Sequence, residues 1–367
     1  MRDSTWPAML VLGLLLLFPN PLTAEESPGA PPMIPGPSSS TDVESAVMPL
    51  CPPLQLLSRD APAACPEFRL DGDGGAGPSS DAEPSSERAP ATDERKPRNL
   101  LAALLAVAVV AGSAVDSFAD TPHESFHVTH EGFFGRDTYT GGADKVSHFV
   151  DFAIVTKEVA NLYGTIGFSR RDSILLASGV SALGGLVKEI GDGTNQYGFS
   201  WEDLSMDLLG IGTAAAISWA GLDDVVGFRG GILLPPAGSK TCCQVPGKGR
   251  DYSNEIYTAD LQIEGLARRL DLTVGPVRYL LFSATYGTKG YPTGLPESRE
   301  RQVGFEIGLN FKVILDDLGA RRGTWWGYTL HMVFDNFRIP FTSVGYRYDL
   351  NHGRWTGPDN GNGFATR

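Results

Sequence analysis

The stretch Ser200-Trp-Glu-Asp203-Leu-Ser-Met-Asp207-Leu-Leu-Gly210 decides how this chain folds, because it opens an apolar run with a helix-capping pattern. A serine followed three positions later by an acidic residue is typical of a helix start. The apolar run extends from Leu204 to about Gly221 and predicts a helix. The pattern Ser169-Arg-Arg-Asp172 precedes a second run, Ile174 to Glu189, and predicts another helix.

Two further segments have helical spacing. Leu100 to Val115 contains no charged residue, whereas the segment from about Lys145 to Leu162 is amphipathic. Together the four segments predict a four-helix bundle over residues 99–225.

From Phe228 onward the hydropathy alternates, which indicates strands. Runs rich in aromatic and β-branched residues predict antiparallel strands at Arg278–Tyr286, Val303–Val313, Tyr328–Phe334 and Phe341–Tyr348. A closed outer-membrane barrel is the alternative, but it needs about eight strands of about nine residues. The sequence offers four to six, which favours a curved sheet beside the bundle. The expected fold class is therefore α+β, with a β-rich region over residues 228–356.

The chain begins with features of an exported protein. Residues 1–24 contain Arg2, the apolar run Met9–Phe18 and small residues up to Ala24, the layout of a signal peptide. An uncleaved anchor is the alternative, but the run is shorter than the ~20 residues that span a bilayer. No cysteine directly follows the cleavage site, so we expect no lipid attachment there. We expect a bacterial envelope protein, periplasmic or associated with the outer membrane.

Composition indicates disorder on both sides of the folded part. Residues 25–98 are rich in Pro, Ser, Gly and acidic residues and predict a disordered linker, and residues 357–367 predict a disordered tail. In an oxidising compartment the four cysteines could form disulfides, whose pairing the sequence leaves open. These cysteines are Cys51, Cys65, Cys242 and Cys243.

The overall charge excludes one class of partner. The 367 residues carry 30 Lys and Arg against 43 Asp and Glu, a net charge of -13, which argues against binding to nucleic acid. Neither a Gly-x-Ser-x-Gly elbow nor a phosphate-binding loop occurs, so the usual serine hydrolase and nucleotidase signatures are missing.

Ionisable residues gather where the predicted helices begin or end. Buried charges are costly unless they meet one another, a metal or water, so we expect these side chains to converge. On the second predicted helix Asp144 and His148 lie one turn apart, and Asp203 and Asp207 repeat this spacing on the fourth. The candidate set is Asp144, Lys145, His148, Glu189, Asp192, Asp203 and Asp207.

This set suits three roles. A histidine with several carboxylates can hold a divalent metal, with Asp144, His148, Asp192 and Asp207 as expected ligands. It can also act as acid and base through His148, Glu189 and Asp203, with Lys145 binding an anion. A structural polar network is the alternative that we favour. In that network Asp203 would cap its helix with Ser200, and Asp192 would form the turn before Gly193.

A second histidine group, His123-Glu-Ser-Phe-His127, matches the His-Glu-x-x-His pattern of zinc proteases. Its flanks lack an apolar periodic run, and Val128, Thr129 and Gly132 disfavour a helix. A connecting segment with solvated histidines is the better interpretation.

Small residues recur at every fourth position of the third and fourth helices, a spacing that lets helix backbones approach closely, often in membranes. These residues are Ala177, Ser181, Gly185, Gly210, Ala214 and Ser218. The third and fourth segments each offer about fifteen uncharged residues, and basic residues precede the first. A bundle that packs inside the envelope or dips into a membrane face is therefore favoured over one that crosses it.

The motifs resemble a known family. Glu131-Gly-Phe-Phe-Gly, Gly142-Ala-Asp-Lys-Val-Ser-His148, Lys188-Glu-Ile-Gly-Asp192 and the stretch quoted first are similar to the YfiM-like family of bacterial envelope proteins. The likeness extends through Asp251-Tyr-Ser-Asn-Glu-Ile-Tyr257 and covers roughly residues 120–315. The bundle also resembles VanZ-like membrane proteins, with their Asp-Lys-x-x-His pattern. Asp207 departs from the YfiM-like family, whose members often carry Asn there.

Because that family is largely uncharacterised, the resemblance implies location and architecture more than activity. We expect a membrane-associated structural or lipid-interacting protein, with a membrane or lipid as partner and other envelope proteins as further candidates. The alternative is a metal-assisted or acid-base enzyme acting on an envelope lipid or glycan, with a divalent metal as its cofactor.

Overall fold

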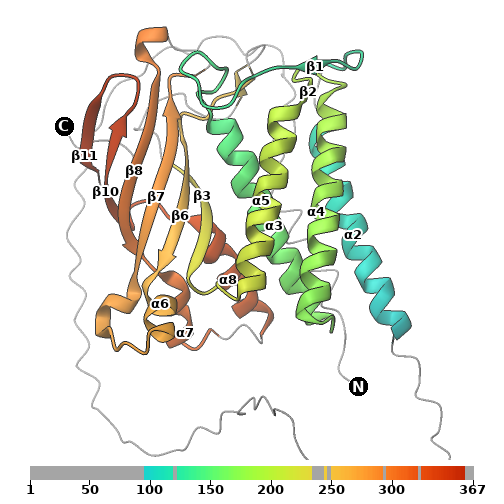
Figure 1. Cartoon of the computed structure of the whole chain (residues 1–367), viewed down its shortest axis with the longest axis vertical. Coiled ribbons are helices and arrows are strands. Elements are labelled where there is room, and N and C mark those ends of the chain that lie inside the picture. Colours follow the sequence, from blue (N-terminus) through green and yellow to red (C-terminus); the bar gives the residue numbers. More distant parts are fainter. Residues whose placement is uncertain are drawn as a thin grey trace, which may run out of the picture. The chain divides into compact units, whose positions relative to one another are not determined.

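The computed structural model describes residues 95–118, 122–233, 244–245, 249–291, 295–320 and 324–359. The expected signal peptide, nearly all of the linker, the four cysteines and the end of the tail lie outside these residues. The described part contains α-helices followed by a mostly antiparallel sheet, so the α+β fold class is confirmed (Figure 1).

Four helices form the first half of the fold, as the hydropathy predicted. They are α2 (Arg95–Phe118), α3 (Ala143–Thr165), α4 (Arg170–Asp192) and α5 (Trp201–Ala220). The capping signals act as expected: Ser169 accepts a hydrogen bond from the backbone N–H of Asp172, and Ser200 from that of Asp203. Gly221 ends α5 in the left-handed conformation, which glycine adopts without steric cost.

The small residues of α4 and α5 face neighbouring helices. A Cβ at Gly210 would lie 2.2 Å from the carbonyl oxygen of Phe149, so α5 packs closely on α3. On α4, a Cβ at Gly184 would meet Ser113 of α2. A core of Leu105, Val159, Leu162, Tyr163 and Ala177 joins α2, α3 and α4. Close backbone contact therefore holds the bundle together.

Seven strands form the main sheet, in the order β11-β10-β8-β7-β6-β3-β9, and only β3 and β9 pair in parallel. Their bounds are β3 (Val226–Ile232), β6 (Glu255–Gln262), β7 (Leu280–Lys289), β8 (Glu300–Leu309), β9 (Phe337–Arg338), β10 (Ser343–Asp349) and β11 (Arg354–Asp359). The ends of this order are β11 and β9, so the described strands form a sheet with two edges rather than a closed barrel.

Shorter elements complete the fold. Two helices, α7 (Phe311–Asp317) and α8 (Trp325–Asn336), contact each other, and α8 also contacts β3. Next to the bundle, β1 (Val128–Thr129) pairs in parallel with β2 (Phe199–Ser200). The remaining elements are β4 (Gln244–Val245), β5 (Gly249–Arg250), α6 (Ile263–Arg269), η1 (Gly275–Tyr279) and η2 (Pro296–Ser298).

Two expected strands are wrong in whole or in part. The segment Tyr328–Phe334 lies within helix α8, which Thr324 caps by accepting a hydrogen bond from the N–H of Gly327. The expected strand Val303–Val313 ends at Leu309, because the side chain of Asn310 accepts a hydrogen bond from Val313 and starts α7. In both segments a local cap outweighs the strand preference of aromatic and β-branched residues, which depends on context.

The sheet has polar residues on its covered face and apolar residues on its outer face. Along β8, Phe305 and Ile307 are exposed, whereas Glu306 between them is 2% exposed. Glu306 accepts two hydrogen bonds from Arg338, of 2.7 and 2.8 Å, and Asp260 pairs in the same way with Arg229. The outward face also exposes Leu261, Phe282, Leu309, Val344 and Tyr346. This distribution is the reverse of that in an ordinary soluble sheet, whose apolar face packs on the core.

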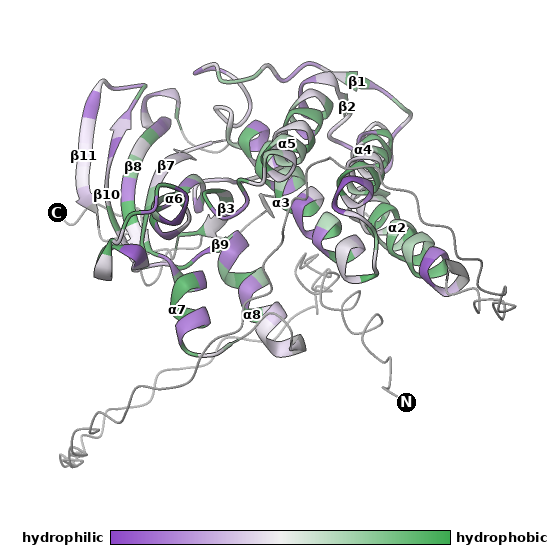
Figure 2. Ribbon diagram, turned by 60° about the horizontal axis from the view of Figure 1, so that its bottom comes forward, coloured by the Kyte–Doolittle hydropathy of each residue, from purple (hydrophilic) through white to green (hydrophobic). Residues whose placement is uncertain are grey.

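Exposed apolar residues also lie on α2 and α4, and Figure 2 shows hydrophobic colouring along α2 and over parts of α4. Both helices are long and apolar enough to cross a membrane, α2 over Pro97–Val115 with mean hydropathy 1.9 and α4 over Arg170–Asp192 with 1.4. Only 6% of the α2 window is buried, against 39% of the α4 window.

Candidate functional site

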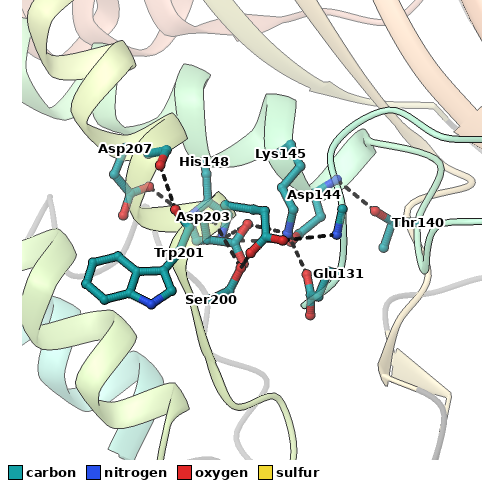
Figure 3. A network of polar contacts seen from close by, with 12 residues as sticks. Glu131, Thr140, Asp144, Lys145, His148, Ser200, Trp201, Asp203 and Asp207 are labelled. Atoms are coloured by element: carbon teal, nitrogen blue, oxygen red, sulfur yellow. Dashed lines mark hydrogen bonds and ion pairs between the residues drawn. The ribbon is translucent and has the colours of Figure 1, made fainter. Parts of the chain in front are cut away.

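Three helix ends and one loop meet at a single polar cluster (Figure 3). The first two turns of α3 and α5 contribute Asp144, Lys145, His148, Asp203 and Asp207, the last turn of α4 contributes Glu189, and the loop before α3 contributes Glu131. The pairing of Thr129 with Ser200 brings the loop to the start of α5. We call these seven residues the polar cluster.

Lys145 links three carboxylates. Its Nζ donates to Glu131 Oε2 at 2.5 Å, to Asp144 Oδ2 at 2.8 Å and to Asp203 Oδ1 at 2.5 Å. Its side chain is 2% exposed, so this ion network is buried. The hydroxyl of Tyr252 donates to Asp144 Oδ1 at 2.5 Å and connects the segment before β6 to the cluster.

His148 is oriented by a carboxylate on the neighbouring helix. Its Nδ1 lies 2.7 Å from Asp207 Oδ1, which favours the tautomer with the proton on Nδ1. Its Nε2 lies 3.9 Å from Asp144 Oδ1 and 3.9 Å from Asp203 Oδ1, beyond hydrogen-bond distance from either. A carboxylate that holds one imidazole nitrogen while the other faces acidic groups is common to metal ligands and to general bases.

Glu189 closes the cluster from α4. Its Oε2 accepts a hydrogen bond from the backbone N–H of Ser200 at 3.1 Å, which ties the end of α4 to the start of α5. Its Oε1 is buried without a hydrogen-bond partner, and so is Oδ2 of Asp207.

Burial and the other charges perturb the acidities in the cluster. Burial raises the pKa of Glu131 to about 7 and that of Glu189 to about 8, and it also raises the pKa of Asp203. Burial opposes ionisation of Asp144 as well, but His148 and Lys145 outweigh it and lower the pKa of that carboxyl.

The pKa values of the two basic groups, Lys145 and His148, are also raised. Burial disfavours their charged forms, but the carboxylates around them prevail and raise the pKa of Lys145 and of His148. The cluster therefore attracts positive charge.

The structure brings together six of the seven residues that the sequence singled out. Asp192 lies beside them rather than among them, because Lys188 donates to its Oδ2 at 2.7 Å and Asn195 to its Oδ1 at 3.1 Å. The backbone N–H of Asp203 takes part in the cap with Ser200, while its carboxylate contacts Lys145, so Asp203 belongs both to the helix cap and to the polar network.

Sequence reasoning gave no role to Glu131 or Tyr252. Both occur in motifs of the expected family resemblance, a signal that could have pointed to them. His123, by contrast, forms an isolated bridge with Asn195, and Val128 and Thr129 form a strand. The zinc-protease pattern therefore lies outside a helix, as expected.

Two groups of side chains in the polar cluster could hold a metal ion. One consists of Asp144, His148 and Asp203, and the other of His148, Glu189 and Asp207. In each group the ligand atoms lie within 4.8 Å of one another, and all the residues are buried. A third group, Glu300, Asp349 and His352, lies where β8 begins and β10 ends, and it is partly exposed.

Comparison with known proteins finds one family whose model matches part of the chain. Residues 130–218, from the loop before α3 through most of α5, match a family described as predicted periplasmic lipoprotein (DUF2279). The match includes every residue of the polar cluster and agrees with the expected location, exported and either periplasmic or associated with the outer membrane. No curated protein and no solved structure matches the chain.

Proposed function

We propose that this envelope protein is a noncatalytic, lipid-interacting protein that inserts apolar outer faces into a membrane. The main support for the proposal is how charged and apolar side chains are distributed between the inside and the outside of the protein. Over the described residues, the sheet turns charged groups inward and apolar groups outward, and the helices α2 and α4 expose apolar side chains on their outer sides. We call the surface formed by exposed Leu261, Phe282, Phe305, Ile307, Leu309, Val344 and Tyr346 the sheet outer face. The helix outer face is formed by exposed Leu104, Val107, Leu175, Leu183 and Leu186.

The helix outer face exposes large apolar side chains of α2 and α4. Leu104 and Val107 of α2 are 55% and 64% exposed, and Leu175, Leu183 and Leu186 of α4 are also exposed. Soluble proteins rarely expose apolar patches of more than a few hundred Å². Lipid acyl chains would remove these apolar side chains from water.

The sheet outer face supports the same partner. Alternation of apolar residues outward and polar residues inward is the pattern of strands that contact lipid. Exported location and two such faces on one chain favour lipid over a protein partner.

In this proposal the polar cluster is structural. Lys145 joins three carboxylates from a loop and two helices, and Glu189 joins α4 to α5. The cluster would hold the helix ends in register while their outer faces meet lipid.

Flotation with phospholipid vesicles tests the proposal. We expect the wild-type chain to float with vesicles and to resist extraction by salt and carbonate. Glu in place of Leu183 or Phe305 should weaken binding at least about tenfold, because a charge in hydrocarbon costs about 3 kcal/mol at full depth. The control is Leu295→Glu, an exposed leucine in a loop outside both faces. A wild-type chain that stays with the soluble fraction would refute the proposal.

An acid-base or metal-assisted enzyme acting on an envelope lipid or glycan is the second candidate. The position of His148 favours it, because Asp207 orients the ring and leaves Nε2 facing two carboxylates. Wild type and His148→Gln would be incubated with phospholipid vesicles and with peptidoglycan. Product that forms with the wild type but not with an equally folded variant would establish this function.

A further inference from the structure

Within the polar cluster, five carboxyl groups, three of them buried and two slightly exposed, meet two basic side chains. The acids are Glu131, Asp144, Glu189, Asp203 and Asp207, and the bases are Lys145 and His148. If all seven were ionised, the cluster would carry three excess negative charges. Lys188, just outside the cluster, pairs with Asp192. Burying unbalanced charge is costly, so such sites either protonate or bind a cation.

The carboxylate oxygens without a hydrogen-bond partner show where the excess negative charge lies. Lys145 and Tyr252 satisfy Asp144, and Lys145 also satisfies Asp203. By contrast, Oε1 of Glu189 and Oδ2 of Asp207 are buried without a partner, although the two residues are 1% and 0% exposed. Buried polar atoms in native proteins are almost always paired, so these two oxygens point to a ligand.

The same two residues form a group with His148. Their ligand atoms all lie within 4.8 Å of one another. In a tetrahedral site with ligands about 2.0–2.2 Å from the metal, the ligand atoms lie about 3.3–3.6 Å apart, so the three side chains would have to move together by up to about 1.5 Å.

The local packing makes room for this arrangement. A Cβ at Gly185 would lie 2.9 Å from Asp207 Oδ2, so the absence of a side chain there lets the carboxylate reach α4 one turn before Glu189. Each of α3, α4 and α5 supplies one member of the group.

We propose that His148, Glu189 and Asp207 bind a divalent transition-metal ion of the Zn²⁺ class, which links α3, α4 and α5. Because Nδ1 is the nitrogen that faces Asp207, it would be the ligand, and binding would release the proton that it shares with Asp207 Oδ1. One imidazole with two carboxylates suits a borderline metal such as Zn²⁺. Ca²⁺ instead takes six to eight oxygen ligands, and Mg²⁺ usually keeps several waters. This inference goes beyond lipid contact, since the outer faces could meet lipid with or without the ion.

Metal analysis of the full chain, purified in detergent without a histidine tag, tests the proposal. After removal of metal with a chelator and addition of Zn²⁺, we expect one bound ion per chain and a higher melting temperature. Glu189→Gln should weaken Zn²⁺ affinity by more than the roughly 10- to 100-fold that loss of an outer partner costs. Mg²⁺ added instead should not raise the melting temperature.

Two matched controls locate the ion. Glu306→Gln changes an equally buried carboxylate in the sheet, and His127→Asn removes the zinc-protease pattern; both should keep the ion. Loss of the ion in His127→Asn but not in Glu189→Gln would overturn the proposal, and so would a folded wild type without a tightly bound ion.

X-ray absorption spectroscopy of the Zn²⁺-loaded wild type needs no variant and remains decisive if Glu189→Gln fails to fold. One imidazole nitrogen with oxygen ligands is expected. Sulfur ligands would assign the ion to cysteines and contradict the proposal.

Discussion

At the scale of single residues, Lys145 is the charge on which the polar cluster depends. Its ammonium group contacts three carboxylates and is almost fully buried. Removing one partner of a buried ion network leaves uncompensated charge, which is far more costly than losing a surface pair.

Lys145→Met should therefore lower the free energy of unfolding by about 3–5 kcal/mol. Denaturant unfolding in detergent measures the change. Arg278→Met is the control, because Arg278 pairs with Asp317 where both side chains are partly exposed, and such pairs contribute about 0–1 kcal/mol. Equal effects of the two substitutions would contradict the structural role of the cluster.

The acidity of Glu131 leads to a prediction about pH. Burial and the carboxylates of Asp144 and Asp203 raise its pKa from 4.5 to about 7, against the opposing effect of Lys145. Between these pH values the folded chain binds more protons at Glu131 than the unfolded chain does. The contribution of Glu131 to stability is thus complete below pH 4.5 and is lost as the pH rises through about 7.

Stability curves for wild type and Glu131→Gln, measured across this range, isolate the contribution. The wild type should lose stability relative to the variant as the pH rises. Parallel curves would show that Glu131 titrates normally in the folded chain.

At the scale of helices and strands, Gly210 sets the distance between α3 and α5. Alanine there would bring a Cβ to 2.2 Å from the Phe149 carbonyl oxygen. This oxygen belongs to the backbone of α3, so it cannot move aside as the end of a flexible side chain can. We expect Gly210→Ala to lower the free energy of unfolding by about 1–3 kcal/mol or more.

Gly212 of the same helix provides the control, because nothing lies within 4 Å of a Cβ added there. Gly212→Ala should be neutral or stabilising by up to about 1 kcal/mol, since alanine is the better helix former. Thermal unfolding of both variants measures the difference, and a neutral Gly210→Ala would contradict the close packing of α3 on α5.

The helices were predictable because their signals are local. Ser169 and Ser200 mark starts, Gly221 marks an end, and apolar spacing fills the length between. The helix over Tyr328–Phe334 was not predictable, because its aromatic and β-branched residues favour a strand wherever they can pair with a sheet. The cap by the Thr324 side chain and the hydrogen bond between buried His331 Nε2 and the carbonyl oxygen of Ala320 favour the helix instead.

The convergence of the candidate site was predictable for a different reason. Charged residues such as His148 and Glu189 in apolar helices must find partners, so their proximity follows from the cost of burial. Which atoms pair depends on side-chain directions and helix packing, which the sequence does not specify. Tyr252 could not be found in this way, since it reaches Asp144 from a distant loop.

At the scale of the whole molecule, the inverted polarity of the sheet connects fold to function. Phe305 and Glu306 are neighbours on β8 whose side chains point to opposite faces. The outer residue should matter for lipid contact and the inner one for stability.

Glu306→Ala should lower the free energy of unfolding by about 3–5 kcal/mol, because Arg338 loses its two charged hydrogen bonds. Phe305→Glu should leave unfolding in detergent almost unchanged while weakening vesicle binding. Comparing unfolding with flotation for the two variants separates the faces. A reversed pattern would contradict the orientation of the sheet.

Contact between the sheet outer face and lipid acyl chains is the central claim, and photo-crosslinking tests it most directly. A photoreactive amino acid would replace Phe305 in chain reconstituted into phospholipid vesicles, with the same label at Leu295 as reference. We predict strong lipid adducts from position 305 and few from position 295. Protein adducts alone, or equal lipid labelling at both positions, would contradict the account.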